Sequence, residues 1–392
     1  MYSTLDILGA FVIFALLILL ASPISSLTRI PLVVAEIILG ALAAHLFGFI
    51  TKIEEIHIIA EAGFLFLMFL CGLEVDIKSF TRMGTSFLSK TLAYFCVLYG
   101  ITCIVVFSIG ISYVYIAALP VMSLGMIVSL IKDYGKNQPW LNLTLKIGIL
   151  GELLSITVLV IIDGVSKYGV GIELGKKLFI LFFFSLIVIL GFRVARVIFW
   201  WMPQIRFIFI PKDDSNSQDL RFVFFLLFGF VLLMVLLDIK AVLGAFLVGC
   251  IISTFFRHKA HLMENLNHIG FGFFVPFFFI HVGSTLDLNT LFNNAQILIY
   301  ALYLIAGMLI LRLISSVIVF GTYFKSAKFT LLFALSSSMP LTFLVATAAL
   351  GRSIGELNDI LYASFVLGAI LESIVFSIII KLIHTYWNPR IK

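Results

Sequence analysis

Long apolar stretches recur along almost the whole chain, and short polar turns separate them. A transmembrane helix needs about 20 consecutive, mostly apolar residues. The pattern predicts thirteen such spans, at residues 5–27, 31–50, 56–74, 90–112, 114–131, 141–163, 174–200, 220–238, 241–256, 268–286, 295–321, 329–350 and 358–386. We therefore predict an all-α polytopic membrane protein.

The composition supports this prediction. Of the 392 residues, 62% are hydrophobic and 12% are charged, whereas soluble domains contain about 45–50% apolar and about 25% charged residues. These values exclude a soluble enzyme and a nucleic-acid-binding protein. The sequence also contains no metal-ligand spacing, nucleophile triad or phosphate-binding loop, so neither catalysis nor a cofactor is expected.

The distribution of positive charge predicts the orientation. With thirteen spans, 18 of the 26 Lys and Arg residues fall on one side of the membrane, six on the other and two inside spans. Cytoplasmic loops are enriched in Lys and Arg. We therefore expect the N-terminus outside and the C-terminus in the cytoplasm of a bacterial inner, or plasma, membrane.

Two apolar spans contain a similar short pattern, in which a glutamate lies between Gly and Ser-Ile, at residues 148–156 and 368–374. The span before each is interrupted, by Pro120 and Ser123 in one case and by Ser338 and Pro340 in the other. Proline breaks the helical hydrogen-bond ladder. Interrupted spans at corresponding places in two halves indicate a transporter binding site.

The thirteen spans and the two matched interruptions predict two repeats of six spans each, separated by one linker span. Residues 1–163 form the first repeat, 174–200 the linker helix and 220–386 the second repeat. A single linker span inverts the second repeat relative to the first. The alternative is that two short matches arose by chance in sequence rich in Ile and Leu.

Three ionisable residues lie deep inside predicted spans: Glu152, Arg312 and Glu372. Placing such residues in a membrane costs free energy, so they usually serve a function. A carboxyl group in a dry bundle prefers to hold a proton, which a monovalent cation can replace. Glu152 is therefore the predicted binding group for proton and cation. Ser155, on the same side of its helix, Ser123, Thr342 and the unwound carbonyl groups could complete the cation's shell.

Arg312 cannot lose its proton and needs a partner. If it pairs with Glu372, the pair is structural and leaves Glu152 free to cycle. If it pairs with Glu152, it competes with the transported cation. The sequence leaves both pairings open.

Several motifs resemble the monovalent cation:proton antiporters of the Kef and NapA type, over nearly the whole chain. They are Glu36 with Gly40, the run Gly72-Leu-Glu-Val-Asp76, the interrupted span around Ser123, the run 243–249, and the run Pro276–Gly283. The resemblance implies a homodimer, with an elevator-like core of spans 4–6 and 11–13 that contains two crossed broken helices.

The chain departs from that family pattern at three places. Gly151 and Glu152 stand where the family carries an acidic pair, Met122 replaces a Thr in the first break, and Ser338–Leu341 replaces the usual start of the second. We expect Gly151 to make room for the longer Glu152. A single carboxylate predicts electroneutral, one-for-one exchange, with the choice between sodium and potassium open. No soluble regulatory domain is expected after the last span.

The predicted function is exchange of Na+ or K+ for protons. Three alternatives compete with it: a channel-like potassium efflux protein, an organic-anion symporter, and a non-transporting sensor that keeps the fold. The sequence lacks a potassium-channel filter of the TVGYG type, which argues against a standard channel.

Overall fold

The computed structural model describes residues 4–28, 30–48, 53–74, 84–135, 138–169, 217–237, 241–256, 259–286, 294–324 and 326–386, with a few isolated positions between 171 and 288. These ranges are almost entirely helical. The predicted linker span at 174–200 lies mostly outside the described residues, as does Asp76.

The helices belong to two compact units. The first unit comprises Met1–Ile53, Thr81–Asp163 and Phe279–Lys392, and the second comprises Glu54–Phe80 and Gly164–Phe278. Each unit therefore combines segments that are far apart in the sequence.

The first unit contains two groups of helices that follow the same order. The first group is α5 (Thr85–Ile109), the short α6 (Val114–Ala118), α7 (Leu124–Tyr134) and most of α8 (Pro139–Tyr168). The second group is α16 (Ala295–Phe324), α17 (Ala327–Ser337), α18 (Leu341–Ser353) and α19 (Asp359–Tyr386). The unit also includes α1 (Thr4–Thr28), α2 (Leu32–Leu46) and the end of α14 (Val275–Ser284).

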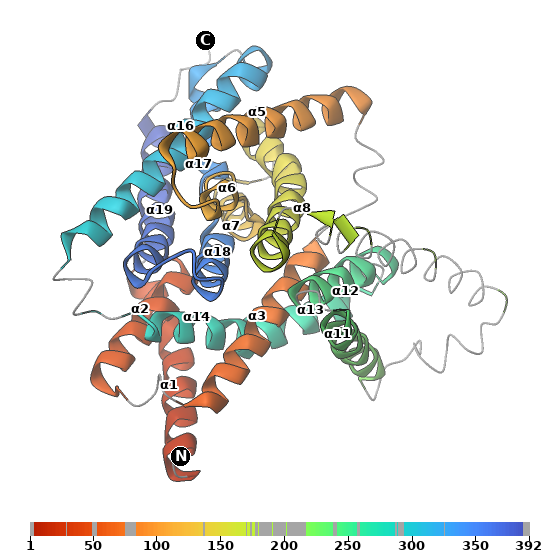
Figure 1. Ribbon diagram of the computed structural model, residues 1–392, viewed down its shortest axis with the longest axis vertical. Coiled ribbons are helices and arrows are strands. Elements are labelled where there is room, and N and C mark those ends of the chain that lie inside the picture. The colour runs from red at the N-terminus through yellow and green to blue at the C-terminus, as the bar shows by residue number, and fades with distance from the viewer. Residues whose placement is uncertain are drawn as a thin grey trace. The chain divides into compact units, whose positions relative to one another are not determined.

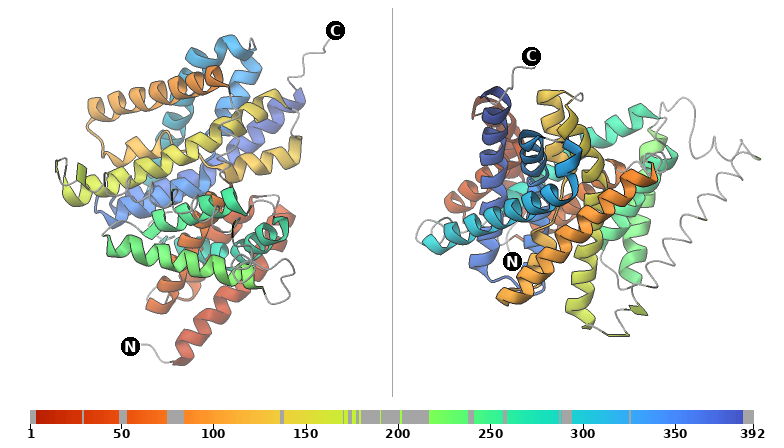
Figure 2. Two further views of the ribbon diagram at one scale, coloured as in Figure 1. Left: turned by 90° about the vertical axis from the view of Figure 1, so that its right-hand side faces the viewer. Right: turned by 90° about the horizontal axis from the view of Figure 1, so that it is seen from above.

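The second group packs closely on itself, because α16 contacts both α17 and α19. The long helices α5 and α16 also contact each other, and Figure 2 shows both as extended, nearly straight rods. Figure 1 shows α6, α7 and α18 between α8 and α19, so the interrupted helices lie inside this unit.

The second unit contains α3 (Glu54–Glu74), α11 (Gln218–Leu236), α12 (Ala241–Phe255) and α13 (Ala260–Ile269). A π-helical turn, η2 (Gly270–Phe274), joins α13 to α14. Lys259, just before α13, forms an ion pair with Asp219 in the first turn of α11. This pair fixes the start of α13 against α11.

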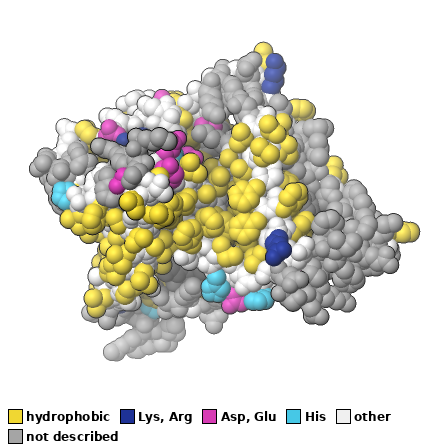
Figure 3. Space-filling model, turned by 90° about the horizontal axis from the view of Figure 1, so that it is seen from below, with side chains coloured by type: hydrophobic (Ala, Val, Ile, Leu, Met, Phe, Trp, Pro, Cys, Tyr) yellow, Lys and Arg dark blue, Asp and Glu magenta, His cyan; other side chains and the backbone are white. Residues whose placement is uncertain are grey.

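The described helices agree closely with the predicted spans. Eight are long and apolar enough to cross a membrane, or nine if α17 and α18, which are bent by 45°, form one span. The largest differences are at two starts: the stretch predicted to begin at residue 268 begins seven residues earlier, at His261, and α5, predicted from residue 90, begins five residues earlier, at Thr85. Large apolar side chains remain exposed on the outer helices, and Figure 3 shows a face with a broad hydrophobic area. Lipid is the environment that such a surface requires.

Glycines allow two close helix crossings. In the first unit, a Cβ atom at Gly40 of α2 would lie 2.0 Å from the carbonyl oxygen of Ile280 in α14, and one at Gly283 would lie 2.0 Å from that of Ile37. The backbones touch because these positions have no side chain. Small residues of this kind drive helix packing in membranes, where apolar burial adds little.

The second unit repeats this arrangement. A Cβ atom at Gly72 of α3 would lie 2.2 Å from the carbonyl oxygen of Phe246 in α12, and one at Gly249 would lie 2.1 Å from that of Phe69. In both crossings, each helix presents a carbonyl oxygen and, three positions later, a glycine. The carbonyl oxygen of one helix meets the glycine of the other.

Replacing either Gly40 or Gly249 by alanine should destabilise the protein. The added methyl group meets a backbone oxygen, which cannot rotate away, and overpacking of this kind costs about 1–3 kcal/mol. Thermal unfolding in detergent would measure the effect. The matched control is Gly100→Ala in α5, where nothing lies within 4 Å, and it should leave stability unchanged or raise it slightly. Equal unfolding temperatures for all three variants would contradict the close crossings.

Candidate functional site: two broken helices and a buried arginine

Both predicted helix breaks are present. The first helix stops after Ala118 and resumes at Leu124, and Pro120 lies within the gap. The second stops after Ser337 and resumes at Leu341, and Pro340 precedes the new helix. Proline removes a backbone donor and disfavours a continuous ladder, which explains why the chain breaks at these points.

The halves of the two broken helices contact each other in pairs: α6 contacts α18, and α7 contacts α17. Ser123 directly precedes α7 in an extended conformation, and its hydroxyl lies 2.8 Å from the hydroxyl of Thr342, in the first turn of α18. The N-terminal ends of α7 and α18 therefore meet at this hydroxyl pair. Helix N-termini carry partial positive charge.

Arg312 of α16 is fully buried and donates hydrogen bonds to the first break. Its Nη1 donates to the carbonyl oxygen of Leu119 at 2.8 Å and to that of Met308 at 3.3 Å, and its Nη2 donates to the carbonyl oxygen of Val121. The last carbonyl groups of a helix have no partner within the helix. The guanidinium supplies these partners and places a positive charge at the C-terminal end of α6, where it is favourable.

The sequence suggested that Arg312 pairs with a carboxylate, but its hydrogen bonds go to backbone carbonyl groups. Its charge also interacts with the carboxyl group of Glu372 on α19. Glu372 is fully buried, and neither of its oxygens has a hydrogen-bond partner among the described residues.

Helix α8 brings Glu152 and Ser155 to the first break. Glu152 is 1% exposed. Ser155 accepts a hydrogen bond from the backbone N–H of Met122 at 3.0 Å and donates one to the carbonyl oxygen of Gly151 at 2.7 Å. These two hydrogen bonds link the non-helical backbone at Met122 to α8, and Ser155 lies about one turn after Glu152.

Gly151 provides space for Met122. A Cβ atom at Gly151 would lie 2.3 Å from the sulfur of Met122. Gly148, almost one turn earlier, accommodates Ile127 of α7 in the same way, with 2.8 Å to the methyl carbon. The glycines on this face of α8 therefore allow the first broken helix to approach closely.

Sequence reasoning missed three polar side chains near these residues, Tyr94, Tyr99 and Thr144, and noted Ser336 only as part of the second interrupted span. Tyr94 and Tyr99 of α5 interact electrostatically with Arg312, and the Tyr99 hydroxyl faces Ser155. The hydroxyls of Thr144 in α8 and Ser336 in α17 lie 2.9 Å apart. Polar groups within apolar spans were the available signal, but only the fold shows which of them meet.

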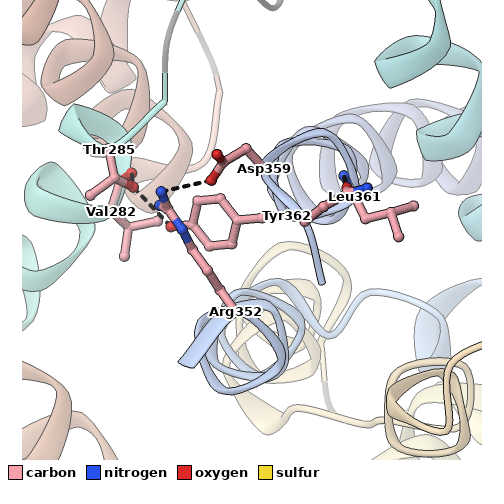
Figure 4. Close-up of polar contacts among 7 residues, drawn as sticks. Val282, Thr285, Arg352, Asp359, Leu361 and Tyr362 are labelled. Atoms are coloured by element: carbon pink, nitrogen blue, oxygen red, sulfur yellow. Dashed lines mark hydrogen bonds and ion pairs between the residues drawn. The ribbon is translucent and has the colours of Figure 1, made fainter. Parts of the chain in front are cut away.

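A second polar cluster joins three helices at the end of α18 (Figure 4). Arg352 forms an ion pair with Asp359 at 2.8 Å, and its guanidinium carbon lies 4.7 Å from the centre of the Tyr362 ring. The Tyr362 hydroxyl lies 2.9 Å from that of Thr285, just after α14. The cluster therefore connects the α18–α19 turn to the end of α14.

Arg312→Lys should lower the unfolding temperature measurably. An ammonium group is a single point of positive charge and lacks the planar fork that reaches two carbonyl groups at once. Leaving a buried carbonyl unsatisfied costs about 1–3 kcal/mol. Thermal unfolding in detergent at neutral pH measures this, with Lys146→Arg as the control, since Lys146 is exposed on α8. A wild-type unfolding temperature in Arg312→Lys would show that the carbonyl contacts contribute nothing.

Tyr362→Phe removes one hydroxyl from the second cluster and keeps the ring under Arg352. We expect a loss of about 0.5–1.5 kcal/mol, the usual net contribution of one hydrogen bond. Thr285→Val should cost a similar amount, and the double variant should cost little more than either single variant, because both remove the same bond. Fully additive losses would contradict the Thr285–Tyr362 bond.

Comparison with known proteins gives a consistent result. The family model described as "Sodium/hydrogen exchanger, transmembrane" matches residues 12–385. The Bacillus subtilis protein named "Putative Na(+)/H(+) antiporter YjbQ" is 27% identical over 383 residues, which cover 91% of this chain and 59% of that protein. The chain thus spans less than two thirds of the length of YjbQ.

Two further proteins extend this comparison. "Probable Na(+)/H(+) antiporter 3" of Methanocaldococcus jannaschii is 24% identical, covering 89% of this chain and 88% of that protein. The "Glutathione-regulated potassium-efflux system protein KefC" of Salmonella typhi is 26% identical, covering 71% and 44%. Among solved structures, the sodium proton antiporter MjNhaP1 from M. jannaschii has a TM-score of 0.65 at 15% identity, covering 96% of this chain and 99% of that one, so the fold is shared.

Proposed function

Because this chain belongs to the sodium/hydrogen exchanger family, we propose that it exchanges a monovalent cation, Na+ or K+, for protons across the membrane. It is a multi-pass membrane protein, and its family consists of transporters and not of enzymes. The observation that carries the proposal is a buried carboxyl group, Glu152, beside a broken membrane helix.

Glu152 performs the exchange by binding either a proton or a cation. In a low-dielectric interior, a buried carboxylate is unfavourable in its charged form unless a positive charge balances it. A proton neutralises it when the cation is absent, and the cation displaces the proton when it arrives. Since Gly151 carries no second acidic group, one charge moves in each direction, and the exchange is electroneutral.

The order of the helices and their glycine crossings support two inverted repeats, and we propose an elevator-like movement with them. The order of α5, broken α6–α7 and α8 is matched by α16, broken α17–α18 and α19. The glycine crossing of α2 with α14 has the same spacing as that of α12 with α3. This is the relation expected if α2 corresponds to α12 and α3 to α14. We extend the proposal to thirteen spans, a homodimer, and a plasma membrane location with the N-terminus outside.

A channel-like potassium efflux path is the second candidate. The similarity to proteins named potassium-efflux systems favours it. In that case Glu152 shapes a pore, and potassium flux does not depend on a proton gradient. Flux of protons against a cation gradient distinguishes the two mechanisms.

Glu152→Gln should abolish cation-driven proton movement. The amide keeps the shape of the side chain but cannot hold a proton or a charge. Proteoliposomes with an internal pH dye, tested with sodium, potassium and lithium separately, would measure the exchange. We expect wild type to dissipate a pH gradient on cation addition, and Glu152→Gln to match protein-free liposomes.

Glu61→Gln is the matched control, because Glu61 is exposed on α3 with 69% of its side chain accessible. It should exchange like wild type. Proton movement that persists in Glu152→Gln would place the site elsewhere. Potassium flux without proton movement in wild type would favour the channel, and no flux at all would favour a sensor that keeps the fold.

A further inference from the structure

We propose that Glu372 is a second proton-binding residue, whose proton keeps Arg312 on the first helix break and so keeps the exchange site intact. The proposal rests on the exchange at Glu152 proposed above and concerns its regulation, because the proton on Glu372 stays in place while Glu152 exchanges. It is carried by hydrogen-bonding atoms of Arg312 and Glu372 that have no partner in the described part of the chain.

Glu372 and Arg312 lie on helices that contact each other, α19 and α16, and both side chains are fully buried. The two groups interact electrostatically. Among the described residues, however, neither oxygen of Glu372 has a hydrogen-bond partner, and the Nε of Arg312 has none either. Both Nη atoms of Arg312 donate instead to backbone carbonyl groups. The guanidinium therefore binds the first break and leaves the carboxyl group without a hydrogen bond.

This arrangement fits a carboxyl group that holds a proton. A buried carboxylate is tolerated when hydrogen-bond donors and a positive charge together compensate for the water that it has lost. Glu372 has the charge of Arg312 nearby but receives no donor from the residues that the structure describes. The protonated group is neutral and costs far less to bury. In the conformation described, Glu372 is therefore protonated.

Arg312 is the charged group that acts on Glu372 within the described residues. Helix α19 contacts α16, α17 and α18, and it meets α6 and α7 through the ring pairs Tyr115–Phe365 and Tyr134–His384. The other ionisable side chains described on α16, α17 and α18 are Tyr300, Tyr303, Tyr323, Lys328 and Arg352. Those on α19 lie toward its two ends and are Asp359, Tyr362, Lys381 and His384. The charge of Arg312 therefore decides between the two forms of Glu372.

Loss of the proton changes what Arg312 binds. A carboxylate accepts two parallel N–H bonds from a guanidinium, and such charged bonds are stronger than bonds to neutral groups. An ionised Glu372 therefore draws the guanidinium away from the carbonyl groups of Leu119 and Val121. These carbonyl groups then lose their partners inside the membrane, where an unsatisfied backbone group is costly. The first break is no longer stable in the conformation described.

The first break transmits this change to α8, the helix that carries the exchange site. The backbone N–H of Met122, the residue after Val121, donates to Ser155 on α8 at 3.0 Å. The side chain of Met122 packs against Gly151 on the same helix. A shift of the backbone at Val121 therefore disturbs both contacts. The carboxyl proton thus positions α8 through the guanidinium and takes no part in the exchange itself.

Infrared spectroscopy tests for the proton without any transport assay. At neutral pH, wild type should show the carbonyl stretch of a protonated carboxyl group that is missing from Glu372→Gln. The matched control is Glu61→Gln, which alters an exposed glutamate on α3 and should remove carboxylate bands instead. A spectrum in which Glu372→Gln also removes carboxylate bands would overturn the proposal.

The unfolding temperature in detergent gives a second readout. Glutamine is a neutral isostere of the protonated carboxyl group, so Glu372→Gln should unfold close to wild type at neutral pH. If Glu372 is ionised, the same variant leaves the charge of Arg312 buried without its counter-charge, and removing one member of a buried ion pair is strongly destabilising. A large fall in unfolding temperature, or a variant that does not fold, would contradict the protonated form.

The pH profile of exchange in proteoliposomes tests the regulation. Wild type should lose exchange as alkaline pH removes the proton from Glu372. Glu372→Gln has no such proton to lose and should keep exchanging to a pH about one unit higher, which is a tenfold lower proton concentration. The titration of Glu152 is common to both proteins, so the difference between the two profiles reports Glu372.

The failure of this proposal is distinguishable from that of the proposed function. Absence of exchange in wild type with every cation refutes the function, while the infrared and unfolding results still decide whether Glu372 is protonated. Exchange that requires Glu152 but has the same pH profile in wild type and Glu372→Gln refutes only the role of Glu372. A folded but inactive Glu372→Gln would show that Glu372 itself exchanges protons, and this also overturns the proposal.

Discussion

A guanidinium bound to backbone carbonyl groups is the interaction on which the other features of the site depend. A helix broken inside a membrane exposes carbonyl groups that water cannot reach, and each unsatisfied group costs several kcal/mol. Arg312 satisfies Leu119 and Val121 at the first break. The same carbonyl groups stabilise the buried charge of Arg312, which cannot be removed by deprotonation. The break and the arginine therefore require each other.

The close approach of two backbones then sets the position of α8, the helix that carries Glu152. Helix α8 meets the broken helix through Gly148 and Gly151, and the relay through Ser155 fixes the register between them. The crossings at Gly40 and Gly249 use the same means. In a membrane, apolar side chains gain little by leaving lipid, so small residues that let backbones touch set the geometry. The position of α8, and with it that of Glu152, follows from the missing side chains at Gly148 and Gly151.

The second break is stabilised differently from the first. At the end of α17, the hydroxyls of Ser336, Ser337 and Ser338 donate back to carbonyl groups of their own helix, at 2.8–3.1 Å. Neutral hydroxyls thus satisfy one helix end and a fixed cation satisfies the other. This asymmetry lies within two otherwise matched groups of helices. The fixed cation, Arg312, interacts electrostatically with Glu372, which gives a physical reason to expect different roles for Glu372 and Glu152.

The sequence by itself determined the helices, the family and the breaks. A membrane span is recognised by comparing the length of an apolar stretch with the thickness of the membrane. Proline interrupts a helix through its own covalent structure. Only the tertiary structure decided what the polar groups do. Arg312 could bind a carboxylate or a carbonyl, and the sequence does not show that Gly151 faces Met122. Both outcomes depend on segments far apart in the chain, whose approach is set by backbone contact and not by local pattern.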